Sequence, residues 1–162
     1  VIYNFTKIPV TLEKDKNINY CERQVGIDLQ VPTVSISCVD NDCYTYNQTH
    51  KMKITITDDR SGFYSDANSI KIGWSDSNIV PPTNWKTLTG GVISDYNNSS
   101  NKTIQDGQMV FTTSLNEDAS GDKVSGDYYL WVLGTSVKDK AQNSPADKQS
   151  DIIKYDNMNM SR

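Results

Sequence analysis

Hydrophobic and polar residues alternate with a period of two along most of this chain. In residues 51–58, for example, lysine and threonine separate Met52, Ile54 and Ile56. Such alternation predicts strands with one buried and one solvated face, as in antiparallel sheets. The same pattern predicts further strands at residues 33–38, 69–75, 85–88, 91–95, 108–115, 127–137 and 151–155.

The segments between these strands are rich in Asp, Asn, Ser and Gly, which favour turns. The chain has 17 Asp but only 3 Glu, and its 14 Ile, 12 Val and 14 Thr favour strands over helices. These features predict an all-β fold, an immunoglobulin-like antiparallel β-sandwich of about seven strands over residues 26–156. A closed barrel is the structural alternative.

The first 25 residues follow a different pattern. Residues 1–12 predict a strand interrupted by Pro9, and residues 13–24 are charged and unpatterned, which indicates a linker or exposed loop. We therefore expect residues 1–25 to form an extended arm or the remnant of an upstream module. Residues 157–162 are expected to form a C-terminal tail.

The charge balance narrows the classes of partner. A net charge of −4 and a pI near 4.9 argue against nucleic acid, which selects basic patches. The chain contains no apolar run of about 18 residues, so we expect no membrane insertion.

No constellation of catalytic residues is recognisable. His50 is the only histidine, and it lies in a polar stretch that predicts a loop. A serine or cysteine nucleophile would need this residue as its base, and no glycine-rich phosphate loop is present. We therefore expect no catalytic residues and no enzymatic function.

The three cysteines are Cys21, Cys38 and Cys43. Four residues separate Cys38 from Cys43, so a disulfide could close this short loop, with two reduced thiols as the alternative. An extracellular location would permit the disulfide. Cys21 would then be free or paired with another chain. A single histidine and this cysteine spacing argue against zinc.

Four blocks have a familiar order and spacing: Ile27-Asp28 with Pro32-Thr33-Val34; Asp58-Asp59-Arg60-Ser61-Gly62; Trp74-Ser75-Asp76-Ser77 with Pro81-Pro82 and Trp85; and Tyr128-Tyr129-Leu130-Trp131-Val132 with Asp139-Lys140-Ala141-Gln142-Asn143. With these blocks, residues 26–156 resemble the immunoglobulin-like repeat domains of bacterial cell-surface and secreted proteins of the adhesin type. The chain departs from the family pattern at Gln142, where a glycine is usual.

The resemblance implies an extracellular, non-catalytic module that acts as a structural spacer or an adhesion domain. Its partners would be neighbouring immunoglobulin-like modules, other copies bound through edge strands, or a host glycan or protein. Two alternatives remain. One is a carbohydrate-binding module of a secreted glycoside-active enzyme, and the other is a phage virion fibre or decoration domain.

Oxygen-bearing side chains gather at the predicted strand ends, namely Asp28, Asp58, Asp59, Asp139 and Asn143. In an immunoglobulin sandwich, the turns after the second and sixth strands can fall near the opening segment. Ca²⁺ takes six to eight oxygen ligands, and related adhesin repeats bind calcium at module junctions. One interpretation is therefore a junction Ca²⁺ that stiffens an array of modules. The other is that these side chains cap turns, with no cofactor.

Two aromatic residues, Trp85 and Tyr96, lie in or beside predicted loops. They are candidates for stacking on a sugar ring, with packing over the sheet as the alternative. Trp74 and Trp131 share the apolar faces of their strands and are expected in the core.

Overall fold

The computed structural model describes residues 4–14, 17–39, 43–45, 48–64, 68–94, 107–118 and 123–156, and only the backbone of residues 4–26. Tyr96 and the predicted tail at residues 157–162 lie outside the described residues. Within the described part, no helix is long and apolar enough to cross a membrane.

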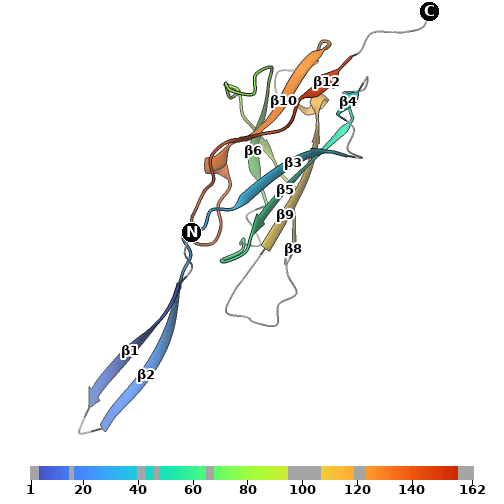
Figure 1. The fold of residues 1–162 in the computed structure, drawn as a ribbon. Helices are drawn as coiled ribbons and strands as arrows, with labels where there is room; N and C mark the ends of the chain where they lie inside the picture. The colour runs from blue at the N-terminus through green and yellow to red at the C-terminus, as the bar shows by residue number, and fades with distance from the viewer. Residues whose placement is uncertain are drawn as a thin grey trace, which may run out of the picture.

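The chain from residue 33 onward forms a sandwich of two sheets (Figure 1). The first sheet contains, in spatial order, β3 (Thr33–Cys38), β5 (Lys51–Asp58), β9 (Gly107–Ser114) and β8 (Val92–Ser94). The second contains β4 (Tyr44–Thr45), β12 (Ile153–Tyr155), β10 (Gly126–Val132), β6 (Ile70–Ser75) and β7 (Lys86–Leu88), with β11 (Lys148–Gln149) also paired to β10. Two 3₁₀ turns follow β9 and β10, η2 (Leu115–Glu117) and η3 (Gly134–Ser136).

The strand order is that of an immunoglobulin sandwich. In chain order, β3, β5, β9 and β8 are the first, second, fourth and third strands of the first sheet, and β10 lies between β6 and β12, the last strand, in the second sheet. Among the described strands of the sandwich, all pairs are antiparallel except β4 with β12. The all-β sandwich predicted from the sequence is therefore confirmed.

The core lies between the two sheets and follows the predicted alternation. Met52, Ile54 and Ile56 of β5 are all buried. The opposite sheet contributes Ile70, Ile72, Trp74, Leu130 and Val132. Trp74 lies in this core as expected, but Trp131 does not: it alternates with Leu130 and Val132 and is buried outside the core cluster. The Trp131 indole Nε1 donates a hydrogen bond to the Ser77 carbonyl, which satisfies its one polar atom.

The last long strand is shorter than its apolar run predicts. Residues 127–137 were expected to be one strand, but β10 ends at Val132 and η3 follows. A Cβ atom at Gly134 would lie 2.1 Å from the Pro145 carbonyl oxygen. The chain that returns through Pro145 therefore passes directly over Gly134, which only glycine permits, and the chain forms η3 at this point instead of extending β10.

The expectation of a linker at residues 13–24 is wrong. β1 (Asn4–Lys14) and β2 (Asn17–Ile27) form an antiparallel hairpin, with Lys14 opposite Asn17 and Asn4 opposite Ile27. β2 is a strand because it pairs with β1. It covers no described part of the core, so its residues do not have to alternate between hydrophobic and polar. Pro9 does not interrupt β1, because both strands of a two-stranded ribbon are edges that tolerate proline.

The hairpin forms a sheet of its own. β1 and β2 pair with no described strand of the sandwich. Figure 1 shows them extending away from one end of the sandwich as a separate ribbon. The segment from Asp28 to Pro32 is the only chain connection between the ribbon and β3.

We predict that Gln142→Gly stabilises the protein. Gln142 has a φ of 70°, in the left-handed region that costs a residue with a Cβ about 1 kcal/mol. Glycine removes this cost but gains freedom in the unfolded chain, so we expect the free energy of unfolding to rise by roughly 0.5 kcal/mol in urea denaturation.

Gly90→Ala is the matched converse. Gly90 has a φ of 80°, and a Cβ atom there would have nothing within 4 Å, so the substitution changes backbone conformation alone. It should lower the free energy of unfolding by about 1 kcal/mol. A loss of stability in Gln142→Gly would show that the glutamine side chain makes contacts that outweigh its backbone conformation.

Candidate metal centre

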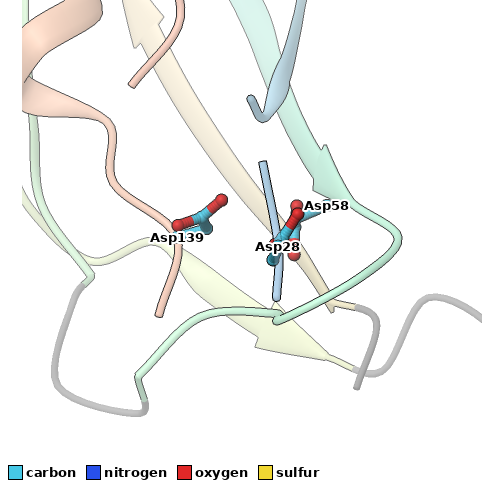
Figure 2. Close-up of side chains that lie close together, drawn as sticks. All are labelled: Asp28, Asp58 and Asp139. Atoms are coloured by element: carbon cyan, nitrogen blue, oxygen red, sulfur yellow. The ribbon is translucent and has the colours of Figure 1, made fainter. Parts of the chain in front are cut away.

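Three carboxylates converge at the end of the sandwich next to the hairpin. Asp28 directly follows β2, Asp58 is the last residue of β5, and Asp139 lies in the turn between η3 and β11. One carboxylate oxygen from each residue lies within 4.8 Å of the other two. Figure 2 shows the side chains of Asp28 and Asp58 close together, with Asp139 facing them.

The alternation of β5 places Asp58 in the interior. Met52, Ile54 and Ile56 point into the core, so Asp58, two residues further on, has the same orientation. Asp58 is only 2% exposed to solvent. A carboxylate therefore occupies a position at which the strand pattern calls for an apolar side chain.

The two oxygens of the Asp58 carboxylate have different surroundings. Oδ2 accepts hydrogen bonds from the backbone N–H of Ser61 at 2.8 Å, from that of Arg60 at 3.4 Å, and from that of Gly62. It thus caps the turn after β5, in which Gly62 has a φ of 69°. Oδ1 is buried and accepts no hydrogen bond. Turn capping accounts for one oxygen and leaves the other without a partner.

Asp139 is fixed in the opposite turn by Asn143. The Asn143 backbone N–H donates to Asp139 Oδ1 at 2.8 Å, and the Asn143 side-chain Nδ2 donates to Oδ2 at 2.9 Å. Asp139 is fully buried, with 0% exposure. Each oxygen keeps a second lone pair for a further ligand. The backbone N–H of Lys140 donates to the Gly62 carbonyl at 2.9 Å, which joins this turn to the one after β5.

Asp28 brings the third carboxylate from the connection to the hairpin. Its Oδ1 accepts a hydrogen bond from the Gln30 backbone N–H at 2.9 Å, while Oδ2 is buried and unpartnered. The Asn143 side-chain Nδ2 donates to the Asp28 carbonyl at 3.0 Å. The centre therefore contains two buried carboxylate oxygens without partners, one on Asp28 and one on Asp58.

Burial and neighbouring negative charges disfavour ionisation of Asp58 and Asp139. Burial, reinforced by the charges of Asp28 and Asp139, raises the pKa of Asp58 from 3.8 to about 6, although the Gly62 N–H opposes the shift. Burial also raises the pKa of Asp139, with the Asp28 charge adding to it and the hydrogen bonds from Asn143 opposing it. A cation between the three groups would remove both penalties.

The geometry suits a hard divalent cation. Oxygens bound to one Ca²⁺ at about 2.3–2.6 Å can be no more than roughly 5 Å apart, and these three satisfy that limit. Three protein oxygens leave several coordination positions for water, as in the weaker calcium sites of extracellular proteins. Carboxylate ligands without thiolate or imidazole are typical of calcium and magnesium.

The structure separates the five predicted residues into two groups. Asp28, Asp58 and Asp139 meet, and Asn143 contacts both Asp28 and Asp139. Asp59 lies outside the cluster: its side chain is 49% exposed and lies 4.0 Å from the Arg60 guanidinium. Asp59 is the first residue after β5, so the alternation that turns Asp58 inward does not turn Asp59 inward.

Backbone groups of the centre were not predicted from the sequence. The Gly62 N–H and carbonyl contact Asp58 and Lys140 respectively, so this one residue links the two turns. Every residue carries these groups, so residue type gives no signal for them. The Asp-x-x-Ser-Gly spacing is the one pattern from which the cap on Asp58 could be inferred.

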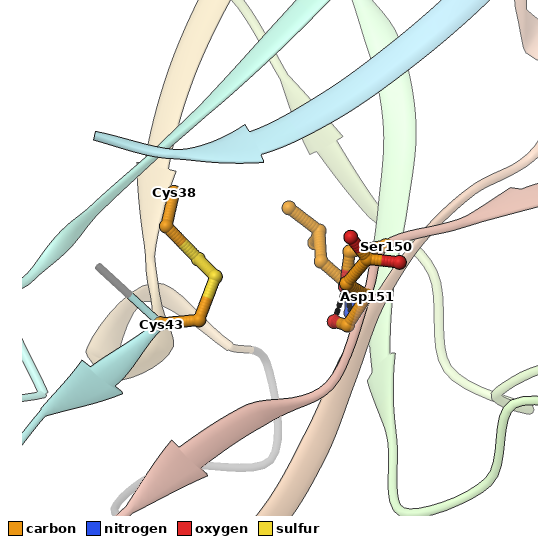
Figure 3. Close-up of a disulfide and its surroundings, with 5 residues drawn as sticks. Cys38, Cys43, Ser150 and Asp151 are labelled. Carbon is orange, nitrogen blue, oxygen red and sulfur yellow. Dashed lines mark hydrogen bonds between the residues drawn. A yellow bond between two sulfur atoms is a disulfide. The ribbon is translucent and has the colours of Figure 1, made fainter. Parts of the chain in front are cut away.

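A disulfide between Cys38 and Cys43 lies where the chain changes sheets (Figure 3). Cys38 ends β3 in the first sheet, and Cys43 precedes β4 in the second, where its carbonyl accepts a hydrogen bond from the Lys154 N–H at 2.8 Å. A cavity of about 150 Å³ beside it is lined by Ile36, Ser37, Cys38, Cys43, Met52, Ser150 and Asp151. The disulfide therefore fixes the crossing from one edge strand to another.

Trp85 is partly buried just before β7, and His50 is partly buried just before β5.

We predict that the metal-free protein loses stability as pH rises from about 4 to 7. Because the fold raises the pKa of Asp58 to about 6, the stabilisation from its protonated form is full below 3.8 and is lost as pH passes through 6. The loss is on the order of 3 kcal/mol. Urea denaturation in EDTA across this range would measure it.

Asp58→Asn isolates this contribution from that of the other carboxylates. The amide cannot ionise, so the difference in unfolding free energy between the variant and the wild type should grow with pH. Parallel pH profiles for the two proteins would contradict the prediction.

We also predict that removing the disulfide lowers stability. Closing a loop of this length stabilises a fold by about 2 kcal/mol in the chain-entropy model. The Cys38→Ser, Cys43→Ser double variant should therefore have a lower free energy of unfolding in urea. Reduction of the wild type with dithiothreitol should reproduce the loss and leave the double variant unchanged. Equal stability of the oxidised and reduced wild type would contradict it.

Comparisons with known proteins identify no relative of this chain: no protein-family model, no curated protein and no solved structure matches it.

Proposed function

We propose that this chain is a non-catalytic, extracellular structural module that binds Ca²⁺ at the end of the sandwich next to its hairpin. It would serve as a spacer or adhesion domain of a bacterial surface or secreted protein. The observation that carries the proposal is the buried, unpartnered Oδ1 of Asp58 in a residue whose carboxylate lies beside two others, with one oxygen of each within 4.8 Å of the other two.

The energetic case rests on the cost of such an arrangement without a cation. A buried polar atom without a partner costs about 1–3 kcal/mol, and more when the group is charged. Here Asp28 and Asp58 each contribute one such atom, and the fully buried Asp139 adds a third carboxylate beside them. A bound divalent cation would interact with all three carboxylates at once. Ion binding would therefore explain why these three groups are buried together.

The extracellular assignment is supported by the disulfide. Such bonds persist in oxidising compartments and are rare in the cytosol. Calcium affinities typical of extracellular modules, with Kd of roughly 10⁻⁴–10⁻³ M, also suit a site with three carboxylates and several waters. The assignment to a bacterial surface protein rests on the sequence resemblance of residues 26–156.

We expect Ca²⁺ to raise the melting temperature of the wild-type protein. At tenfold the Kd, a single site stabilises the folded state by about 1.4 kcal/mol, which corresponds to roughly 3–6 °C for a chain of this size. Calorimetric or circular-dichroism melts of the EDTA-treated protein, with and without millimolar Ca²⁺, would measure the shift. Magnesium at the same concentration tests ion preference.

Two substitutions one residue apart serve as a matched pair. Asp58→Asn should abolish the calcium-dependent shift, whereas Asp59→Asn removes the same charge from an exposed side chain and should retain it. The proposal would be contradicted if Ca²⁺ left the melting temperature of the wild type unchanged. It would also be contradicted if Ca²⁺ shifted the melting temperatures of both variants equally.

A further inference from the structure

Among the residues whose side chains the structure describes, few apolar groups hold the root of the hairpin on the sandwich. β2 ends at Ile27, and the chain is next anchored at Pro32, which is buried. Between these points Leu29 is 62% exposed and Val31 is 44% exposed, and Ile27 itself is 48% exposed. Apolar burial therefore does little to hold the connecting segment on the sandwich.

Within this segment, Asp28 contacts the sandwich through both its backbone and its side chain. Its carbonyl accepts the hydrogen bond from the Asn143 side chain, and its carboxylate enters the cluster with Asp58 and Asp139. Asp28 is also the first residue after β2. The position of the hairpin root is thus coupled directly to the contents of the carboxylate cluster.

Electrostatics make this coupling conditional on a cation. Without one, the negative charge of Asp28 lies beside two other carboxylates, and their repulsion opposes the docking of the hairpin root. The hydrogen bond from Asn143 to the Asp28 carbonyl contributes about 1 kcal/mol and opposes this repulsion only weakly. With a divalent cation, the same three groups attract one ion, and Asp28 becomes a ligand that ties the root to both turns.

On the basis of the calcium binding proposed above, we infer that the ion sets the orientation of the β1–β2 hairpin: bound Ca²⁺ holds the hairpin in one direction relative to the sandwich, and loss of the ion releases it. The site would thereby set the direction of the outer edges of β1 and β2, which pair with no described strand of the sandwich and are suited to pairing with a strand of another chain.

A distance measurement between the two parts tests this inference. Cys21 is the one cysteine outside the disulfide, and it lies in β2. Nitroxide labels at Cys21 and at Val92→Cys, an exposed position on β8, report the hairpin-to-sandwich distance by electron–electron double resonance. We expect a broad distribution in EGTA that narrows to a single peak in Ca²⁺.

Three variants control for other causes. Asp28→Asn loses the ligand on the hairpin side and should give the broad distribution in both conditions, whereas Asp59→Asn should behave as the wild type. A second label pair, Val92→Cys with Val124→Cys in a Cys21→Ser background, lies within the sandwich and should not respond to Ca²⁺.

Calcium binding is measured by calorimetry on the same labelled protein, which separates the two proposals. Saturable binding with a narrowed distribution supports both. Saturable binding with an unchanged distribution, or an equal change in the label pair within the sandwich, overturns the inference and leaves the proposed calcium site intact. No calcium binding overturns both.

Discussion

Burial of one face of β5 against the opposite sheet is the interaction on which the rest of the structure depends. Met52, Ile54 and Ile56 form the centre of the core, and β5 pairs with both β3 and β9, so it positions the whole first sheet. A shift of its register by one residue would turn every buried side chain to solvent. Hydrophobic burial therefore fixes the strand, and through it the location of Asp58.

The carboxylate cluster follows from that constraint. The strand that buries three apolar side chains ends by burying an acid, and two turns bring further acids to the same point. The turns are held by short-range hydrogen bonds from Ser61, Gly62 and Asn143, so Asp58 and Asp139 are placed before any ligand arrives. A preorganised pair of like charges costs stability in the metal-free fold and lowers the conformational cost of binding a cation.

Different interactions hold the chain at the two ends of the sandwich. At one end the cluster lies where the chain passes from the hairpin into β3. At the other, the Cys38–Cys43 disulfide fixes the step from β3 to β4 and so keeps β4 on the outer edge of β12. Edge strands invite pairing with other chains, and this covalent link helps to cover one of them. The hairpin is the contrasting case, since neither of its strands is paired to the sandwich.

The sequence by itself determined the fold class, the core and most strand positions, because burial of alternate residues is a local pattern that a strand imposes on its own residues. Residues 33–38 and 51–58, for example, were predicted with the bounds that the structure has. The acids of the cluster could be named from their places at strand ends, but only the tertiary structure selected Asp28, Asp58 and Asp139 and left Asp59 outside. Local patterns do not encode the distance between turns that are 81 residues apart in the chain, from Asp58 to Asp139. The β1–β2 hairpin escaped prediction for the same reason: its second strand is defined by its partner, and pairing between strands is a property of the folded chain.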